Sequence, residues 1–486
     1  RALAAAGRIR GGASRAAQAR GPTSWRLRER LSTTVPCDTP SGEAPAETIW
    51  LHAASLGECK GLWAVAQQLA TELMREGMTD TGPVLPDTRI LLTTNTVAGL
   101  TFLRRGLATL PSSRGRHASG RRVLFAARLA PLDHPALARA FLAENSIRAL
   151  VLFEVELWPH WVAAARRAGV PVLWISARLT PRARRRYAGN RLFAGALGRV
   201  LRDLTWIQTQ TENEEHALRR LGAPRVETGG DLRGLHSLRS HPNPSSPGSA
   251  DEDRTPRADS LNVRRGGIVF VSFHAHELPT LVAALRTERD EGDALPQTPL
   301  LIFPRKLHEV PTFVRLLSPY GFVLHSERAT PREPGDSGER AQGATTERNP
   351  LRVIVDAYGL VDAHLAHAHT AVIGGSFDPE ARIGGHNAWE PLRAGCRMII
   401  GPHHHNQRAL VDRLKESGLI RVAHDGAELR EDLTRAAGAA LSATHPQVFA
   451  EQAAHRACVA EESARLEAAA ARACHMIVAC ARSNDA

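Results

Sequence analysis

The sequence predicts an α/β protein with two halves, each a parallel β-sheet covered by helices. Short apolar runs alternate with helix-like segments in two series, along 48–236 and along 263–425. This alternation is typical of βαβ units, whose parallel strands are buried on both faces. A stretch rich in Pro, Ser, Asp and Arg, Ser237 to Asp259, separates the two series and indicates a linker. With 486 residues, the chain is long enough for two domains of ordinary size.

Six apolar runs mark the strands expected in the first half. They are Thr48–Ala53, Arg89–Thr94, Arg122–Ala127, Arg148–Leu157, Val170–Ser176 and Leu204–Gln210. Helical patterns follow the first two runs, from Cys59 to Arg75 and from Val97 onward. We therefore assign 48–236 to a first Rossmann-like domain, preceded by a basic N-terminal segment at 1–47.

Six further runs mark the strands expected in the second half. They are Gly267–Phe273, Pro299–Pro304, Gly321–Ser326, Arg352–Ala357, Thr370–Gly375 and Arg397–Pro402. The polar stretch Glu327 to Asn349 is expected to be an insertion loop. We assign 237–262 to the linker, 263–425 to a second Rossmann-like domain and the Ala-rich end, 426–486, to a helical region. Two open α/β domains predict a ligand in a cleft near the carboxyl ends of their strands.

Composition narrows the classes of function. A hydrophobic content of 43% and a charged content of 23% exclude a wholly disordered chain, and no run approaches the roughly 18 apolar residues of a transmembrane helix. The six cysteines include no Cys-x-x-Cys pair, which disfavours a disulfide scaffold or a zinc ribbon. The net charge of +12 comes from arginine and by itself allows nucleic acid, an anionic membrane or a phosphorylated substrate as the partner. An aromatic content of 5% disfavours nucleic acid.

The N-terminal segment is rich in arginine. The sequence begins at Arg1, and the stretch from Arg1 to Arg28 contains no acidic residue. Three interpretations stay open for it: a transit peptide, a basic segment next to a membrane helix that precedes it, and a disordered tail.

The loop after the first expected strand carries a candidate catalytic group. Glu58 ends the sequence Ser55-Leu56-Gly57-Glu58, which is expected to open a helix. Ser55 is placed to cap that helix, and Gly57 is expected to allow a tight turn. A helix dipole lowers the pKa of a carboxylate in the first turn, which favours a plain electrostatic role, whereas a second carboxylate nearby raises it toward the range of a general base.

The end of the fourth expected strand supplies two further carboxylates. Glu154 and Glu156 lie two residues apart, which places them on the same face of an extended chain. Acids that end a buried strand favour a pair facing a cleft, with a solvated strand end as the alternative.

Three loops at strand ends of the second half predict an anion-binding site. Their candidate residues are Arg305; Gly374, Gly375 and Ser376; and Gly384, Gly385, His386, Asn387 and Glu390. Backbone N–H groups of glycine loops can bind a phosphate, arginine binds phosphate or carboxylate, and a glutamate can accept hydrogen bonds from ribose hydroxyls. A simple turn is the alternative for each glycine pair alone. The histidines of 364–369 and 403–405 lack a carboxylate or cysteine at ligand spacing, so we expect no metal.

These segments resemble motifs of the 3-deoxy-D-manno-octulosonic acid (Kdo) transferases of bacterial lipopolysaccharide synthesis. The resemblance runs from about Trp25 to Arg413, most of the chain, and the motifs follow the family's order. They are RLRERL (Arg26–Leu31), WLHAASLGE (Trp50–Glu58), LLTTNT (Leu91–Thr96), ELWP (Glu156–Pro159), ISARL (Ile175–Leu179), TQTENE (Thr209–Glu214), PRKLHE (Pro304–Glu309), IGGSF (Ile373–Phe377) and GGHNAWEP (Gly384–Pro391).

The resemblance implies a GT-B glycosyltransferase, in which two Rossmann-like domains face a central cleft. It implies an inverting transfer of Kdo from CMP-Kdo to the 6′ hydroxyl of a lipid A precursor, lipid IVA, with Glu58 as the general base. The first domain would then bind the acceptor, and the anion-site residues of the second domain would bind CMP-Kdo. CMP-Kdo is a substrate, so no cofactor is expected. The residues expected beside the acceptor are Ser55, Gly57, Glu156 and Arg178.

The resemblance also implies a place in the cell, because the family is usually held on the inner membrane by an N-terminal helix. We expect an enzyme at the cytoplasmic face of the bacterial inner membrane, in contact with the anionic membrane surface and not with nucleic acid. The arginines expected to contact lipid A phosphates or that surface are Arg178, Arg182, Arg184, Arg185 and Arg186, with a solvated basic face as the alternative.

Two departures from the family pattern concern possible site residues. Gly230-Asp231-Leu232-Arg233 stands where we expect a stretch such as GNLK, and His274-Ala275-His276-Glu277 keeps a histidine and a glutamate but alters the residues between them. Three competing hypotheses stay open. They are a GT-B enzyme that uses another sugar nucleotide, a non-enzymatic scaffold descended from such an enzyme, and a basic nucleic-acid binder.

Overall fold

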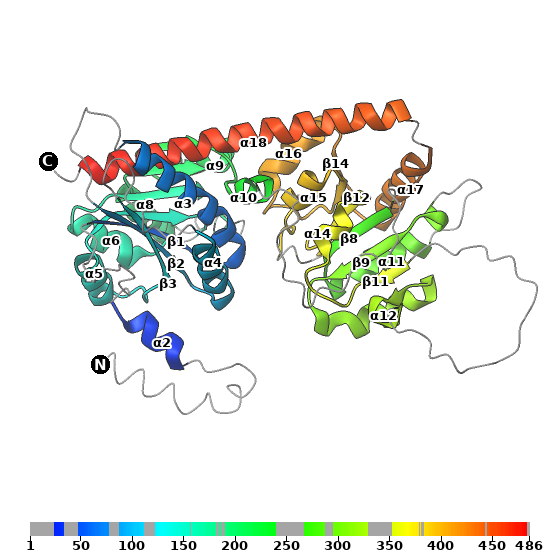
Figure 1. Cartoon of the computed structure of the whole chain (residues 1–486), viewed down its shortest axis with the longest axis horizontal. Coiled ribbons are helices and arrows are strands. Elements are labelled where there is room, and N and C mark those ends of the chain that lie inside the picture. Colours follow the sequence, from blue (N-terminus) through cyan, green and yellow to red (C-terminus); the bar gives the residue numbers. More distant parts are fainter. Residues whose placement is uncertain are drawn as a thin grey trace, which may run out of the picture. The chain divides into compact units, whose positions relative to one another are not determined.

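The computed structural model divides the chain into two compact units. The first comprises Arg1–His236 and Arg465–Ala486, and the second comprises Ser237–Ala464 (Figure 1). The structure describes residues 24–33, 47–76, 87–110, 122–155, 157–180, 183, 185, 189, 191–239, 267–286, 295–328, 352–378, 380, 383–442 and 445–483. Most of the predicted linker, most of the predicted insertion loop and Glu156 lie outside these residues.

The first unit is built on a seven-stranded parallel sheet of order β3-β2-β1-β4-β5-β6-β7. The strands are β1 (Glu47–Ala53), β2 (Thr88–Thr94), β3 (Val123–Leu129), β4 (Ile147–Phe153), β5 (Val172–Ala177), β6 (Trp206–Thr209) and β7 (Val226–Thr228). The helices are α2 (Ser24–Leu31), α3 (Leu56–Glu76), α4 (Val97–Thr109), α5 (Pro135–Glu144), α6 (Pro159–Arg167), α8 (Arg191–Arg202), α9 (Glu212–Arg220) and α10 (Arg233–Arg239). The central strands are buried throughout, as their apolar runs predict.

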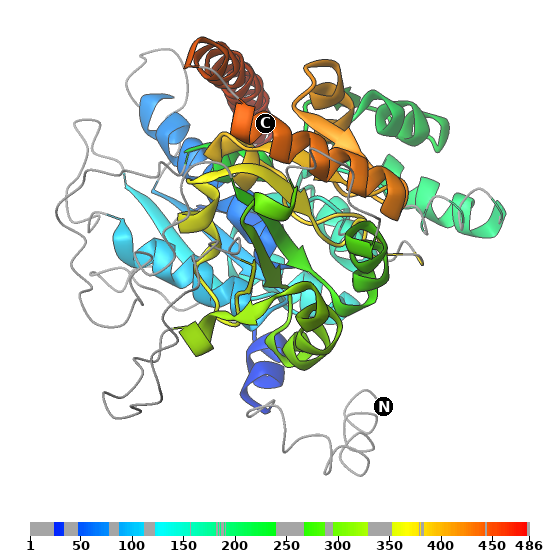
Figure 2. The ribbon, with the colours of Figure 1, turned by 90° about the vertical axis from the view of Figure 1, so that its right-hand side faces the viewer.

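The second unit is built on a second seven-stranded parallel sheet, of order β10-β11-β9-β8-β12-β13-β14. The strands are β8 (Gly267–Phe273), β9 (Leu300–Pro304), β10 (Val323–Leu324), β11 (Arg352–Ile354), β12 (Ala368–Ile373), β13 (Arg397–Ile400) and β14 (Ile420–Val422). The helices are α11 (Leu278–Arg286), α12 (Val310–Leu317), α13 (His325–Arg328), α14 (Val361–Leu365), α15 (Trp389–Ala394), α16 (Arg408–Glu416) and α17 (Gly426–Ser442), with a short 3₁₀ turn, η3 (Ala275–Glu277). The last helix, α18 (His445–Arg482), belongs to the second unit up to Ala464 and to the first unit from Arg465. Figure 2 brings this sheet and its flanking helices to the front.

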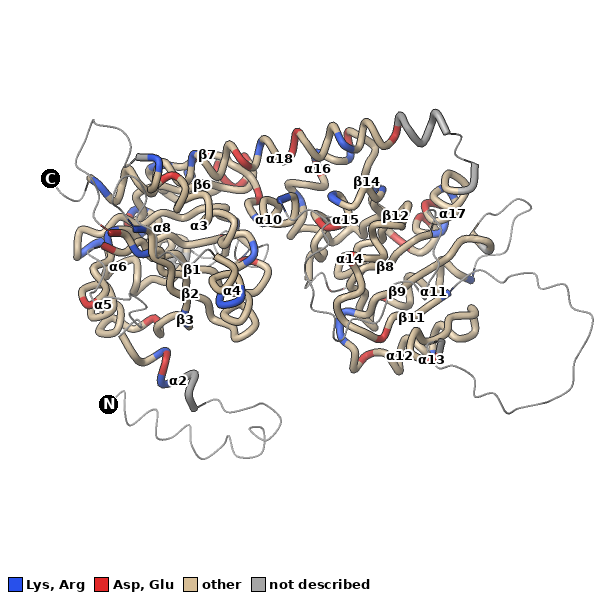
Figure 3. Tube along the Cα trace, viewed as in Figure 1, with Lys and Arg blue, Asp and Glu red and all other residues tan. Residues whose placement is uncertain are grey.

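The strand order of both sheets confirms the predicted fold class, two Rossmann-like parallel-sheet units. Each sheet reverses its order beside a central strand, between β1 and β4 in the first unit and between β8 and β12 in the second. Ligands of such sheets bind outside the carboxyl ends of the strands at this point. Acidic and basic residues are interspersed over the described parts of both units (Figure 3).

Three strand predictions are wrong in extent. The strand expected to run from Arg148 to Leu157 ends at Phe153, and the strand expected over Gly321–Ser326 is only Val323–Leu324. The strand expected over Arg352–Ala357 ends at Ile354. In the second case the chain turns into α13 at His325. No described helix is long and apolar enough to cross a membrane.

Candidate functional site

Glu58 lies in the first turn of α3, directly after the loop that leaves β1. Its Oε2 accepts hydrogen bonds from the backbone N–H groups of Ala54, at 2.6 Å, and Ser55, at 3.1 Å. The Ser55 hydroxyl in turn accepts a bond from the Glu58 N–H at 3.4 Å. This reciprocal arrangement is a capping box, and it fixes the carboxylate at the start of the helix. Glu58 is 9% exposed, so its head group lies at the edge of the protein interior.

Gly57, which precedes Glu58, does not form the tight turn that the sequence predicts. It is part of α3 and does not take a left-handed φ, so the tight turn expected there is absent. A Cβ added at this position would have no atom within 4 Å, and Gly57 is exposed. Position 57 therefore faces open space.

Glu154 follows β4 and carries the second carboxylate of this region. It has a φ of +60° and is only 1% exposed. The extended conformation therefore ends at Glu154, and Glu156, its expected neighbour on the same face, lies outside the described residues. A non-glycine residue in this left-handed conformation stores about 1–3 kcal/mol of strain, and such residues cluster at functional sites.

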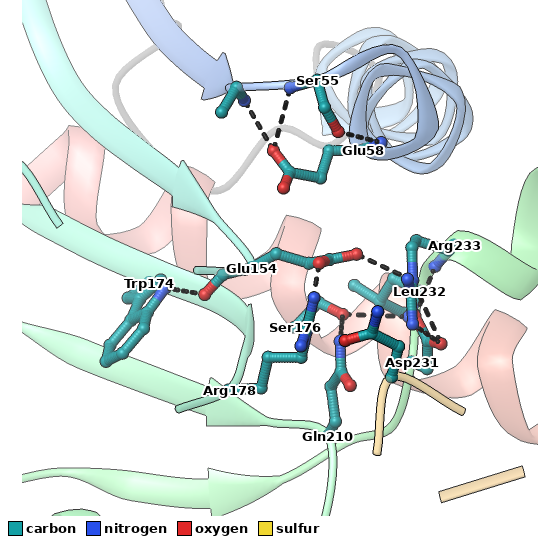
Figure 4. Close-up of polar contacts among 12 residues, drawn as sticks. Ser55, Glu58, Glu154, Trp174, Ser176, Arg178, Gln210, Asp231, Leu232 and Arg233 are labelled. Atoms are coloured by element: carbon teal, nitrogen blue, oxygen red, sulfur yellow. Dashed lines mark hydrogen bonds and ion pairs between the residues drawn. The ribbon is translucent and has the colours of Figure 1, made fainter. Parts of the chain in front are cut away.

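Two guanidinium groups hold the Glu154 carboxylate (Figure 4). Arg178 Nε lies 3.1 Å from Oε2, and Arg233 Nε lies 2.7 Å from Oε1. Arg233 also binds Asp231, with Nη2 2.7 Å from Oδ2 and Nε 2.9 Å from Oδ1. We call Glu154, Arg178, Asp231 and Arg233 the ion network. Sequence reasoning noticed Asp231 and Arg233 only as departures from a family pattern.

Burial and charge pull against each other within the ion network. Burial by itself opposes ionisation of both Asp231 and Arg233. The Arg233 cation nevertheless lowers the pKa of Asp231, and the Asp231 and Glu154 anions raise the pKa of Arg233. Both groups are therefore charged at neutral pH. Arg178 is 11% exposed and pairs with Glu154, and its expected contact with lipid phosphates stays a prediction. Arg185 is exposed, and Arg182, Arg184 and Arg186 lie outside the described residues.

Ser176 joins the segments that carry the ion network. It also has a left-handed φ, +50°, and is fully buried at the end of β5. Its hydroxyl accepts hydrogen bonds from the Leu232 N–H at 3.1 Å and from the Gln210 side chain at 3.3 Å. This contact ties the end of β5 to the loop that leads into α10.

The second unit contains a buried carboxylate of a different kind. Glu277, in η3, is 0% exposed. It accepts hydrogen bonds from four backbone N–H groups, those of His274 at 2.9 Å, Gly375 at 2.8 Å, Ser376 at 3.1 Å and Phe377 at 3.0 Å. Burial raises its pKa, against the effect of these bonds. The donor role predicted for Gly374, Gly375 and Ser376 stays a prediction, but Glu277 already occupies the N–H groups of the latter two.

The two predicted glycine loops interlock. The Gly385 N–H donates to the Gly375 carbonyl at 2.8 Å, and the His386 N–H donates to the Gly374 carbonyl at 3.0 Å. Gly375 has a φ of +73°, and a Cβ there would lie 2.7 Å from the His386 ring. These glycines therefore allow a close approach of two loops, and the N–H groups of Gly385 and His386 are engaged within the protein.

The imidazoles of His274 and His386 meet at the same edge of the second sheet. Their Nε2 atoms are 2.8 Å apart, so that one donates and the other accepts. Burial lowers the pKa of His274 to about 4 and that of His386 to about 3. Both rings are therefore neutral at pH 7. Sequence reasoning selected His386 and missed His274 as its partner, although the altered His274–Glu277 segment had marked the place.

The other candidates of the second unit lie around these loops. The Arg305 side chain is exposed after β9, close enough to His274 and His386 to lower their pKa values further. Asn387 accepts a bond from the Trp389 N–H at 3.0 Å, and Glu390 lies in the first turn of α15. The 403–407 loop covers Gly384, since the Asn406 N–H donates to the Gly384 carbonyl at 2.8 Å. Across the described ranges, no group of three or more His, Cys, Asp or Glu is arranged to hold a metal.

Comparison with known proteins shows which family this chain is similar to. The family model of the 3-deoxy-D-manno-octulosonic-acid transferases matches residues 25–234. A 3-deoxy-D-manno-octulosonic acid transferase of Bordetella pertussis is 30% identical over 365 residues, which cover 74% of this chain and 72% of that protein. One of Chlamydia trachomatis serovar D is 23% identical over 401 residues, 82% of this chain and 78% of that protein. The solved structure of the C-terminal CMP-Kdo binding domain of WaaA from Acinetobacter baumannii is also similar, at 18% identity and a TM-score of 0.27. The matched region covers 38% of this chain and 92% of that domain's chain.

Proposed function

Since this chain belongs to the 3-deoxy-D-manno-octulosonic acid transferase family, we propose that it transfers Kdo from CMP-Kdo to the 6′ hydroxyl of a lipid A precursor, lipid IVA, in lipopolysaccharide biosynthesis. Membership in the family supports a glycosyltransferase that acts on Kdo. The acceptor, the position of the new bond and the inverting course are our proposal.

The position of Glu58 is the observation that carries the proposal. Two backbone N–H groups fix its carboxylate at the start of α3, with open space beside it at Gly57. An inverting transfer needs one base that takes the proton of the acceptor hydroxyl. The hydroxyl oxygen would attack the anomeric carbon of Kdo, the bond from that carbon to the CMP phosphate would break, and CMP would leave with the electron pair. Glu58 would receive the proton.

Residues of the second unit would bind the donor. The exposed guanidinium of Arg305 can donate hydrogen bonds to the phosphate and carboxylate of CMP-Kdo. In the neutral His274–His386 pair, one N–H is used between the two rings, which leaves the Nδ1–H of the accepting ring as a further donor. Arginine next to a leaving phosphate stabilises the charge that develops as the bond breaks. The chemistry needs no cofactor, because the CMP-sugar itself is the activated group.

We place this reaction at the cytoplasmic face of the bacterial inner membrane, where a lipid acceptor would be reached. The net charge of +12 supports contact with an anionic surface.

The test measures CMP release and the lipid product from CMP-Kdo and a tetraacylated lipid A precursor. Glu58→Gln should lose about 10²–10⁴-fold in kcat, the usual contribution of a general base. Glu428→Gln is the matched control, since Glu428 makes a similar contact, 2.9 Å from the N–H of the residue four positions before it, at the start of α17. This control should keep its activity.

Each failure has a different meaning. Unchanged turnover in Glu58→Gln would exclude Glu58 as the base and leave the donor assignment in place. Turnover of another sugar nucleotide, with none of CMP-Kdo, would replace the donor. If the intact protein neither binds CMP-Kdo nor releases CMP, the proposed function is wrong.

A further inference from the structure

Arg233, at the start of α10, lies against the helix that carries Glu58. Gly61 is one turn after Glu58 on α3, and a Cβ added there would lie 2.9 Å from the Arg233 Cα. Side-chain carbons do not approach backbone so closely, so a residue larger than glycine at position 61 would push the two helices apart. The Glu58 anion contributes, after Asp231 and Glu154, to the raised pKa of Arg233, so the two side chains lie within electrostatic reach of each other.

Two buried carboxylates hold Arg233 in this place. Asp231 is 2% exposed and binds the guanidinium through both oxygens, and Glu154 binds its Nε at 2.7 Å. The Arg233 side chain itself is 17% exposed. The field of Arg233 at Glu58 is therefore offset by two anions on the same cation.

Other titratable groups around Glu58 and the ion network come from several elements. His52 on β1 has its pKa lowered to about 3, chiefly by burial, and Cys59 on α3 has its pKa raised to about 12, also chiefly by burial. Both are uncharged at neutral pH. Lys60 follows on α3, Arg178 reaches Glu154 from the end of β5, and Arg465 of α18 donates to the Gly229 carbonyl at 3.3 Å.

We propose that Asp231 and Arg233 act together as positioning residues that set the electrostatic potential at Glu58. The inference rests on the proposed function, because it assigns a task to the same carboxylate. Arg233 favours the ionised form of Glu58, which is the form that can accept a proton. Asp231 weakens this effect, so that Glu58 stays basic enough to take the proton from a hydroxyl group.

The first test is the pH dependence of kcat/KM for the full chain, whose acid limb reports the ionisation of the free base. Asp231→Asn removes an anion, so the limb should move to lower pH by roughly half a unit. Arg233→Gln removes the cation, so the limb should move to higher pH by about the same amount or more. The double variant removes one charge of each sign, so its limb should return close to that of the unmodified protein.

A matched control and a charge-preserving variant separate this role from a structural one. Asp432, in α17, is 5% exposed and pairs with Arg421 and Arg435. Asp432→Asn should lower the melting temperature and leave the acid limb in place. Arg233→Lys keeps the charge and should also keep the limb. If Arg233→Gln does not fold, Asp231→Asn and Arg233→Lys decide the question.

A second readout does not depend on transfer. The carboxyl ¹³C signal of Glu58, assigned by its loss in Glu58→Gln, can be titrated in the same variants. If no Kdo is transferred but this signal shifts as described, the proposed function fails and the coupling stands. If Kdo is transferred but neither the limb nor the signal moves in Asp231→Asn, the inference is overturned.

Discussion

Glu154 in the first unit and Glu277 in the second are both buried carboxylates that follow the carboxyl end of a central strand, at 1% and 0% exposure. Two guanidinium groups hold Glu154, whereas four backbone N–H groups hold Glu277. An isolated buried charge is too costly to keep, so each must be compensated. The compensation differs in kind: guanidinium cations neutralise Glu154, while backbone N–H groups hold Glu277 and thereby fix the course of the loop after β12.

The largest effect in this comparison should come from Glu277→Ala. The change leaves four buried N–H groups without their acceptor, and each such group costs about 1–3 kcal/mol. We expect the free energy of unfolding of the second unit to fall by at least about 4 kcal/mol. Urea denaturation of the full chain measures this loss, with Glu428→Gln as a surface control. A loss below about 1 kcal/mol would show that the loops do not depend on this carboxylate.

A smaller effect should distinguish the two carboxylate environments by pH. The pKa of Asp231 is lowered from 3.8, so its contribution to stability is present above that value and is lost as the pH falls through the lowered pKa. The pKa of Glu277 is raised from 4.5, so its contribution is fully present below that value and is lost as the pH rises through the raised pKa.

Unfolding measured between about pH 3 and pH 7 therefore gives opposite slopes. The stability advantage of the unmodified protein over Asp231→Asn should shrink toward acid pH, and its advantage over Glu277→Gln should grow. Parallel slopes for the two pairs would contradict the contrast between the two environments.

The smallest effect on stability should come from Gly57→Ala. Alanine is favoured over glycine in a helix by about 0.5–1 kcal/mol, and its Cβ has open space at this position. We expect a slightly higher melting temperature together with a raised KM for the lipid acceptor. Because Gly57→Ala should leave the length of α3 unchanged, far-UV circular dichroism serves as the control. An unaltered KM would exclude this space as part of the acceptor path.

Local features of the chain were predictable from the sequence, and contacts between distant segments were not. The apolar runs of β1, β2 and β8 predict their strands, and Ser55 with Glu58 forms a capping box within four residues. The three-residue strands β7 and β14 are too short to leave a clear pattern. The ion network joins the ends of β4 and β5 to the start of α10, and no periodicity in the sequence predicts contacts between these distant segments.

The glycine loops also show that local sequence does not reveal contacts between distant segments. Gly375 and Gly384 both take a left-handed φ, a conformation that glycine favours. Their N–H groups were expected to face a ligand, but that of Gly375 is bound by Glu277, which lies on a different segment. A loop's conformation follows from its residues, whereas the partner of its N–H groups follows from the tertiary fold.

The path of α18 has a consequence for anyone who dissects this gene. The first unit is discontinuous in sequence, because its last part, from Arg465, is reached only after the second unit is complete. Ala469 accepts a bond from Gln208 at 2.9 Å, and Arg472 pairs with Glu227 at 3.1 Å. A clone that stops near residue 236 would lack these contacts. Co-expression of a peptide of residues 465–486, or a gene that fuses these residues ahead of the first unit, would supply these contacts.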